Sequence, residues 1–114
     1  MLIKQSETWW ANIYVGSKIG YSGDCISLDV ARNWLQTYCD SIGFAVTLTK
    51  TEFIYSGGNE PGFIVGLINY PRFPKSSDQL LKKAIYIAEQ LKTLMAQERV
   101  SIVTPTETFM IGRN

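Results

Sequence analysis

A hairpin signal in the middle of the chain constrains the fold more than any other feature of the sequence. Phe44–Tyr55 begins as an alternation of apolar and polar residues, which is typical of a strand with one buried face. Ser56–Gly62 is rich in glycine and also contains asparagine and proline, so it predicts a turn. Phe63–Tyr70 then predicts the returning strand of a hairpin with a longer loop. Pro71 and Pro74 prevent regular strand pairing beyond this point.

Helices and further strands are predicted on both sides of the hairpin. Ser27 is a helix N-cap with Asp29 in the first turn, and Ser76 and Gln79 have the spacing of a capping box. The other predicted elements are strands at Thr8–Gly16, Val100–Val103 and Thr108–Ile111, and helices ending near Ile42 and Gln97. This order predicts an α+β fold with the ferredoxin-like β-α-β-β-α-β order and an added C-terminal strand, in which an antiparallel sheet carries two helices on one face. Residues 1–114 are expected to form one ligand-binding domain.

The predicted strand at Phe63–Tyr70 is apolar on both of its faces. Its two faces carry Phe63, Val65 and Leu67 on one side and Ile64, Gly66 and Ile68 on the other. A two-layer fold covers only one face of its sheet, so the second apolar face needs another cover. We expect a homo-oligomer built on dimers, with folding of the terminal segments over this face as the alternative.

Composition excludes several classes of function. Eleven Lys and Arg residues against ten Asp and Glu residues give a net charge of +1, which is too balanced for duplex nucleic acid to be bound by charge alone. No apolar run approaches the ~20 residues of a membrane helix, and the N-terminus lacks the features of a signal peptide. We therefore expect a cytoplasmic protein without a membrane partner. The chain has no histidine and only two cysteines, which excludes Ser-His-Asp and Cys-His nucleophile pairs and zinc sites. We expect no catalytic residue, no metal and no cofactor.

A cluster of candidate ligand-binding residues follows the third strand. Arg72 stands between Tyr70 and Phe73, where a guanidinium can bind phosphate or carboxylate and a ring can stack on a base. The alternative is that Arg72 pairs with a surface acid while Phe73 packs against the start of the next helix. Asn69 ends an apolar strand, and its side chain is expected either to contact a ligand or to satisfy nearby backbone.

The predicted turn supplies two more candidates. Asn59 and Glu60 have side chains that can read ribose hydroxyls or a base edge, and the glycines around them can form an anion-binding nest. The alternative is that the glycine-rich segment is only a turn, since it matches no phosphate-binding motif. Arg99 and Arg113 are further positive charges that a folded pocket can recruit, with solvated surface as the alternative for both.

Four segments together resemble a known family: Asn12–Gly16, Thr51–Tyr55, Asn59–Gly62 and Ile64–Pro74. From about residue 12 to residue 111 the chain is similar to phage-encoded Thoeris anti-defence proteins of the first-described type. The resemblance implies a sponge that binds a cyclic ADP-ribose isomer without degrading it and thereby inhibits antiphage defence in the infected bacterial host. It implies a non-enzyme, oligomers with pockets near subunit boundaries, and cyclic oligonucleotides as further ligands of some members.

Two other classes of function stay open at this level. A small nucleotide-processing enzyme would use Glu52 or Glu60 as its base. A protein-interaction module would instead block another protein through the apolar sheet face. Single-stranded nucleic acid is a weaker alternative, because the charge is near neutral and the aromatic pattern of RNA-binding sheets is missing.

Overall fold

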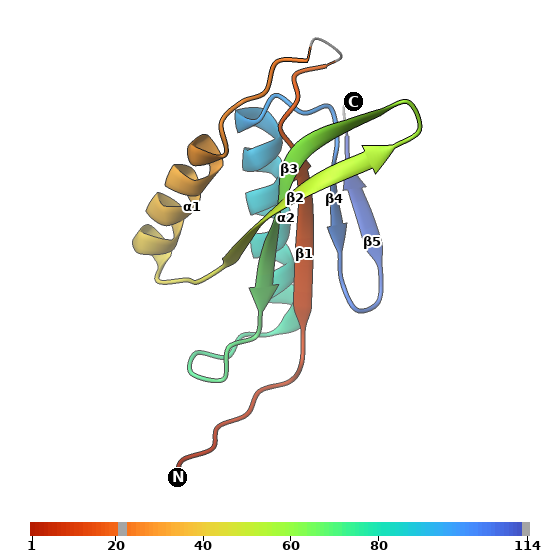
Figure 1. Ribbon diagram of the computed structural model, residues 1–114. Coiled ribbons are helices and arrows are strands. Elements are labelled where there is room, and N and C mark those ends of the chain that lie inside the picture. The colour runs from red at the N-terminus through yellow and green to blue at the C-terminus, as the bar shows by residue number, and fades with distance from the viewer. Residues whose placement is uncertain (21–22, 113–114) are drawn as a thin grey trace.

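The fold is a five-stranded antiparallel sheet with two helices (Figure 1). The computed structural model describes residues 1–20 and 23–112. The elements along the chain are β1 (Trp10–Gly16), α1 (Leu28–Ile42), β2 (Thr47–Tyr55), β3 (Gly58–Ile68), α2 (Ser77–Leu94), β4 (Val100–Val103) and β5 (Thr108–Ile111). The strands lie in the order β2-β3-β1-β4-β5, and every neighbouring pair is antiparallel. The predicted α+β class is therefore confirmed.

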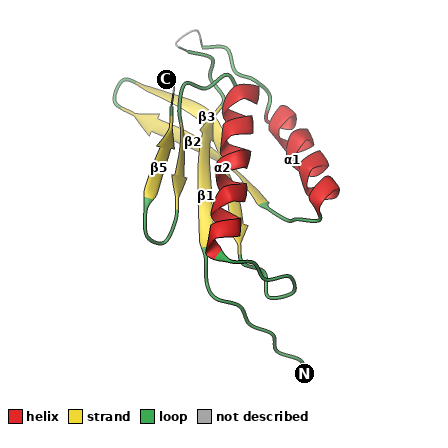
Figure 2. Ribbon diagram, turned by 180° about the vertical axis from the view of Figure 1, so that it is seen from behind, coloured by secondary structure: helices red, strands yellow, loops and turns green. Residues whose placement is uncertain are grey.

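The two helices lie on the same side of the sheet, as both views show (Figures 1 and 2). Helix α2 crosses the middle of this face, where it packs on β1 and β4. Helix α1 lies beside α2 and packs mainly against it, and it does not lie centrally over the strands. The exact ferredoxin-like order predicted from the sequence is not matched by this open five-stranded sheet.

Helix ends follow the local signals in the sequence. The Ser27 side chain accepts a hydrogen bond from the Asp29 backbone N–H at 3.2 Å, and Gly43 ends α1 with a left-handed φ of 67°. At the start of α2, the capping box between Ser76 and Gln79 is formed in both directions, with distances of 3.2 and 3.0 Å. Helix α2 stops at Leu94, earlier than predicted.

The hairpin between β2 and β3 differs from the prediction. Its turn consists only of Ser56 and Gly57, because Tyr55 already pairs with Gly58. Gly57 has a φ of 83°, a conformation that glycine adopts without strain. The predicted seven-residue turn is therefore wrong, and its last five residues belong to β3. Strand β2 also begins at Thr47 and not at the predicted Phe44.

The core lies between the helices and one face of the sheet. Side chains with no exposed surface include Ile13 of β1, Phe63 and Leu67 of β3, and Leu91 of α2. The opposite face of the same strands stays open, and Ile68 on β3 is 46% exposed. This exposure agrees with the two-faced strand seen in the sequence, while the predicted homo-oligomer stays a prediction. Within the described residues, neither helix has the combination of length and apolar character required to span a membrane.

Candidate functional site

The predicted ligand-binding residues fall into two groups at opposite ends of β3. Glu60 lies near the start of this strand, whereas Asn69 follows its last residue. At ~3.3 Å per residue the two side chains are separated by roughly 30 Å along the strand. A small nucleotide therefore cannot contact both groups within one chain. Arg113 lies outside the described residues.

At the Asn69 end, the asparagine side chain is used to hold backbone segments together. Its Nδ2 donates to the Glu7 carbonyl at 2.8 Å, and its Oδ1 accepts from the Lys75 backbone N–H at 2.9 Å. The Ser6 hydroxyl donates to the Asn69 carbonyl at 2.7 Å. Asn69 is only 9% exposed, so these bonds satisfy polar groups that folding removes from water. This arrangement matches the backbone-satisfying alternative for Asn69.

The loop that carries Arg72 is a tight turn on the surface. The Phe73 backbone N–H donates to the Tyr70 carbonyl at 3.1 Å, and the two rings are tilted with centroids 6.1 Å apart. The Arg72 guanidinium lies 5.9 Å from the centre of the Phe73 ring, as a cation–π contact requires. Arg72 and Phe73 are both exposed, and neither lines the cavity of about 380 Å³ that Asn69 and Trp10 help to form.

At the other end of β3, the structure brings Glu60 and Arg99 together. Both line a cavity of about 310 Å³, although they are far apart in sequence. The sequence indicated Glu60 as part of a turn and Arg99 as a separate positive charge. The full lining is Lys18, Gly20, Tyr55, Glu60, Ala96, Gln97, Glu98 and Arg99. Asn59 and Glu52 lie on the opposite side of the hairpin from Glu60 and are exposed, because side chains alternate along each strand.

A backbone hydrogen bond holds the Glu60 carboxylate, and the lack of a side chain at Gly16 leaves space for it. Its Oε2 accepts a hydrogen bond from the Lys18 backbone N–H at 2.9 Å. A Cβ atom on Gly16 would lie 2.8 Å from both Glu60 Oε2 and Gln97 Oε1, so only glycine leaves room here. The Gln97 Nε2 donates to the carbonyls of Lys18 and Met95 at 3.0 and 2.9 Å. The Glu60 carboxylate is thus held at the segment from Gly16 to Lys18, and Gln97 is bonded to the same segment.

Two aromatic rings flank Glu60 on the same face of the hairpin. The ring of Tyr55 covers Gly58, where a Cβ would lie 2.7 Å from the Tyr55 Cε2. The ring of Phe53 covers Gly62 in the same way. Since Glu60 lies between these glycines on one face of β3, a ring stands over the strand on each side of this residue. A carboxylate beside aromatic faces attracts a cation.

The end of α2 presents Gln97 through a tight turn. The Gln97 backbone N–H donates to the Lys92 carbonyl at 2.9 Å, and the Ala96 N–H donates to Thr93 at 3.2 Å. This is the Schellman pattern, which normally has glycine at the position of Ala96. Ala96 has a φ of 51°, a strained value for a residue with a Cβ. Backbone strain of this kind clusters at functional sites, where the surrounding structure holds the residue in its strained conformation.

Sequence reasoning missed most of this site. The predicted site residues did not include four that lie around Glu60 in the structure: Gly16, Phe53, Tyr55 and Gln97. The available signal was the repeat of glycine at every fourth position of β3, in register with Tyr55, Thr51 and Thr47 of β2. Read as cross-strand pairing, this repeat indicates strand and not turn.

Comparisons with known proteins find likeness only at the level of structure. No family model and no curated protein matches the sequence. A phage SAM lyase in complex with S-methyl-5′-thioadenosine is similar in fold, with a TM-score of 0.79, 15% identity, and coverage of 99% of this chain and 95% of that one. A phage SAM lyase in the apo state has a TM-score of 0.73 and 16% identity, with coverage of 100% and 97%.

These comparisons correct the functional expectation drawn from the sequence. Both similar structures are enzymes, which contradicts the interpretation as a non-enzymatic sponge that inhibits Thoeris defence by holding a cyclic ADP-ribose isomer. The sponge interpretation came from the resemblance, and the absence of histidine supported it. That absence excludes imidazole catalysis but not reactions that need no imidazole. The resemblance to the Thoeris anti-defence family is a separate matter that these comparisons leave untested.

Proposed function

We propose that this protein is an enzyme that cleaves a sulfonium nucleoside of the S-adenosylmethionine type, with Glu60 at the reacting site. The observation that carries this proposal is the Glu60 carboxylate, which the Lys18 N–H holds and which lines a cavity together with the Tyr55 ring and Arg99. Support also comes from the fold, which is that of a phage SAM lyase over nearly the whole chain.

The charges of the cavity suit such a substrate. A sulfonium group is a cation with an apolar surface, which the Glu60 carboxylate and the Tyr55 ring of the same cavity attract together. A cation–π contact of this kind contributes about 0.5–2 kcal/mol, depending on how much water is excluded. The substrate also carries an amino-acid carboxylate, which the Arg99 guanidinium can bind with two parallel hydrogen bonds.

The reaction requires neither a metal nor histidine. When the bond between sulfur and the amino-acid side chain breaks, its electron pair stays on sulfur, and the positive sulfonium becomes a neutral thioether. The neutral thioether leaves without a general acid. In our proposal Glu60 accepts the proton from the adjacent carbon, so that a carbon–carbon double bond forms as the carbon–sulfur bond breaks. The other balanced route is attack by the substrate's own carboxylate oxygen, which yields a lactone and needs Glu60 only as charge partner.

The test is to incubate the purified protein with S-adenosylmethionine and to measure S-methyl-5′-thioadenosine by chromatography. We expect Glu60→Gln to lower the rate by roughly 10²–10⁴-fold, which is the range for loss of a general base. Glu52→Gln is the matched control and should leave the rate unchanged, since Glu52 lies on the other side of the hairpin. Proton NMR of the second product separates the alkene from the lactone. Intact S-adenosylmethionine after incubation with the folded wild-type protein would refute the proposal.

A further inference from the structure

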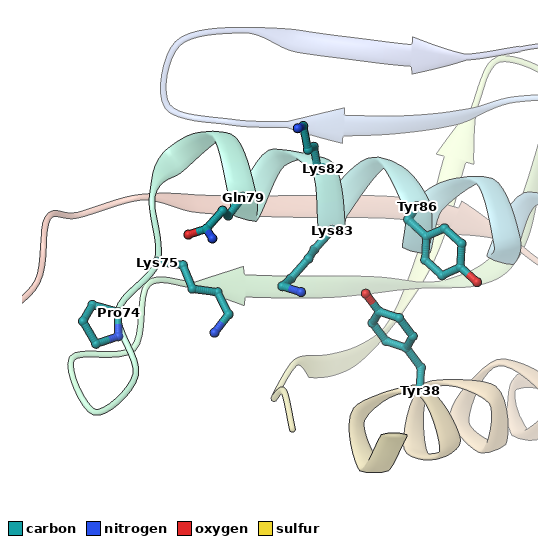
Figure 3. Close-up of a pocket in the computed structure, with 7 residues that line it drawn as sticks. All are labelled: Tyr38, Pro74, Lys75, Gln79, Lys82, Lys83 and Tyr86. Carbon is teal, nitrogen blue, oxygen red and sulfur yellow. The ribbon is translucent and has the colours of Figure 1, made fainter. Parts of the chain in front are cut away.

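A second cavity lies between the two helices, away from Glu60 (Figure 3). Its volume is about 450 Å³, and its lining consists of Tyr38, Pro74, Lys75, Gln79, Lys82, Lys83 and Tyr86. At 1.5 Å per residue, Lys83 on α2 is roughly 20 Å along the helix direction from Gln97, which lines the Glu60 cavity. The two cavities are therefore separate sites in one chain.

Two positive charges converge on this second cavity. The Lys75 and Lys83 ammonium nitrogens lie 5.9 and 5.4 Å from the centre of the same ring, that of Phe44. Both side chains point into the gap between the helices, whereas Lys82 points away from it (Figure 3). Among the described residues that line the cavity, none is acidic. An anion bound between Lys75 and Lys83 would relieve their mutual repulsion.

Neutral hydrogen-bond donors accompany these charges. Burial, followed by the effects of Tyr86 and Cys39, raises the pKa of Tyr38, so its hydroxyl keeps its proton at neutral pH. This hydroxyl points toward Lys83 (Figure 3). The Gln79 Oε1 already accepts from the Ser76 N–H at 3.0 Å, which leaves the amide Nε2 as a donor at the cavity wall.

Tyr38 and Tyr86, which belong to an aromatic cluster with Trp34, form the other wall. The rings of Trp34 and Tyr38 are parallel within 9° at 5.1 Å, and Tyr86 lies 5.5 Å from Tyr38. Tyr86 is 46% exposed, so part of its ring remains uncovered at the edge of the stack. A planar base can extend such a stack, and this kind of contact tolerates any base.

We propose that this cavity is a binding site for a nucleoside monophosphate, separate from the Glu60 site. The phosphate lies between Lys75 and Lys83, and the base stacks on Tyr86. A phosphate monoester carries close to two negative charges at neutral pH, which two ammonium groups balance. The Tyr38 hydroxyl and the Gln79 amide donate to the remaining phosphate oxygens.

Calorimetric titration with AMP tests this assignment, with adenosine and inorganic phosphate as partial ligands. We expect the double variant Lys75→Gln/Lys83→Gln to weaken AMP binding by at least about tenfold, because two charge-assisted contacts are lost. Lys82→Gln is the matched control and should change the affinity less than about twofold, since only its screened charge is lost. Tyr86→Ala should weaken AMP binding but not phosphate binding. Glu60→Gln should leave AMP binding intact, which separates this site from the proposed enzymatic one.

Three outcomes would overturn the proposal. These are no AMP binding by the wild-type protein at millimolar concentration, an unchanged affinity in the folded double variant, or an equal loss in Lys82→Gln. Tighter binding of a single-stranded oligonucleotide through the same lysines would also overturn it, because the ligand of this site would then be a nucleic acid and not a mononucleotide. If the double variant does not fold, NMR of the wild-type protein decides, because AMP must shift the Gln79 side-chain amide and the Tyr86 ring signals.

Discussion

Replacement of Gly16 by alanine tests the position of the Glu60 carboxylate while leaving the carboxylate itself in the chain. Gly16 is the last residue of β1 and pairs with Gly62 of β3. An added Cβ would lie 2.8 Å from Glu60 Oε2 and from Gln97 Oε1. Because ordinary contacts of a Cβ begin near 3.4 Å, the carboxylate must move by roughly half an ångström or more. That movement strains or breaks its hydrogen bond with the Lys18 N–H.

The expected magnitudes differ for stability and for turnover. Both crowded oxygens are the ends of flexible side chains, so the fold can adapt, and the carboxylate can reach water after it moves. Loss of a hydrogen bond to a charged group costs at most about 1.5–3 kcal/mol, and rehydration offsets part of it. A misplacement of about 1 Å at a reacting group, in contrast, can lower a rate by ~10²-fold. Gly16→Ala should therefore remain folded but lose most of its turnover.

The assay combines release of S-methyl-5′-thioadenosine from S-adenosylmethionine with thermal unfolding of the same sample. Gly112→Ala is the control, because a Cβ at Gly112 meets no atom within 4 Å and its φ is not in the left-handed region. The control should match the wild-type protein in both measurements. A folded Gly16→Ala protein with wild-type turnover would refute the reasoning, since the position of Glu60 would then be irrelevant to the reaction.

Three further predictions concern stability and assembly. Ala96→Gly should raise the free energy of unfolding by about 1 kcal/mol in chemical denaturation, because the left-handed φ of 51° is strained only when a Cβ is present; a decrease would contradict this. Burial raises the pKa of Tyr38 above 10.0, so its contribution to stability is complete below that pH and is lost as the pH rises through the raised pKa. The midpoint temperature of thermal unfolding should thus fall less steeply above pH 10 in Tyr38→Phe than in the wild-type protein. The same pH dependence in both proteins would count against this role of Tyr38. The open sheet face around Ile68 predicts a homo-oligomer by light scattering, which Ile68→Lys should dissociate; a wild-type mass of 12.9 kDa would exclude it.

The features predicted correctly from the sequence are those that depend on neighbours a few residues away. The caps at Ser27 and Ser76 act within three positions, and Gly43 ends α1 through its own backbone freedom. The alternation in β3 likewise places Phe63, Val65 and Leu67 on one face, and the structure buries that face. Such local preferences are already present before the chain folds.

The candidate site could not be predicted in this way. Glu60 is bonded to Lys18, which is 42 positions away, and Gln97 is bonded to Lys18 across 79 positions. Composition marks Ser56–Gly62 as a turn, yet Gly58 and Gly62 are strand residues because rings from β2 lie over them. A propensity for turns is weak compared with cross-strand packing, so the tertiary context overrides it.

The sequence by itself determined the helices, the order of the strands along the chain and the lack of imidazole chemistry, because these depend on local pattern and on composition. The tertiary structure decided that Glu60 and Arg99 share one cavity while Asn69 and Arg72 lie at the far end of β3. The physical reason is that a site is made by side chains from distant segments, and their meeting depends on strand register and on which residues lack a Cβ. One glycine, Gly16, makes room for the carboxylate on which the proposed reaction depends.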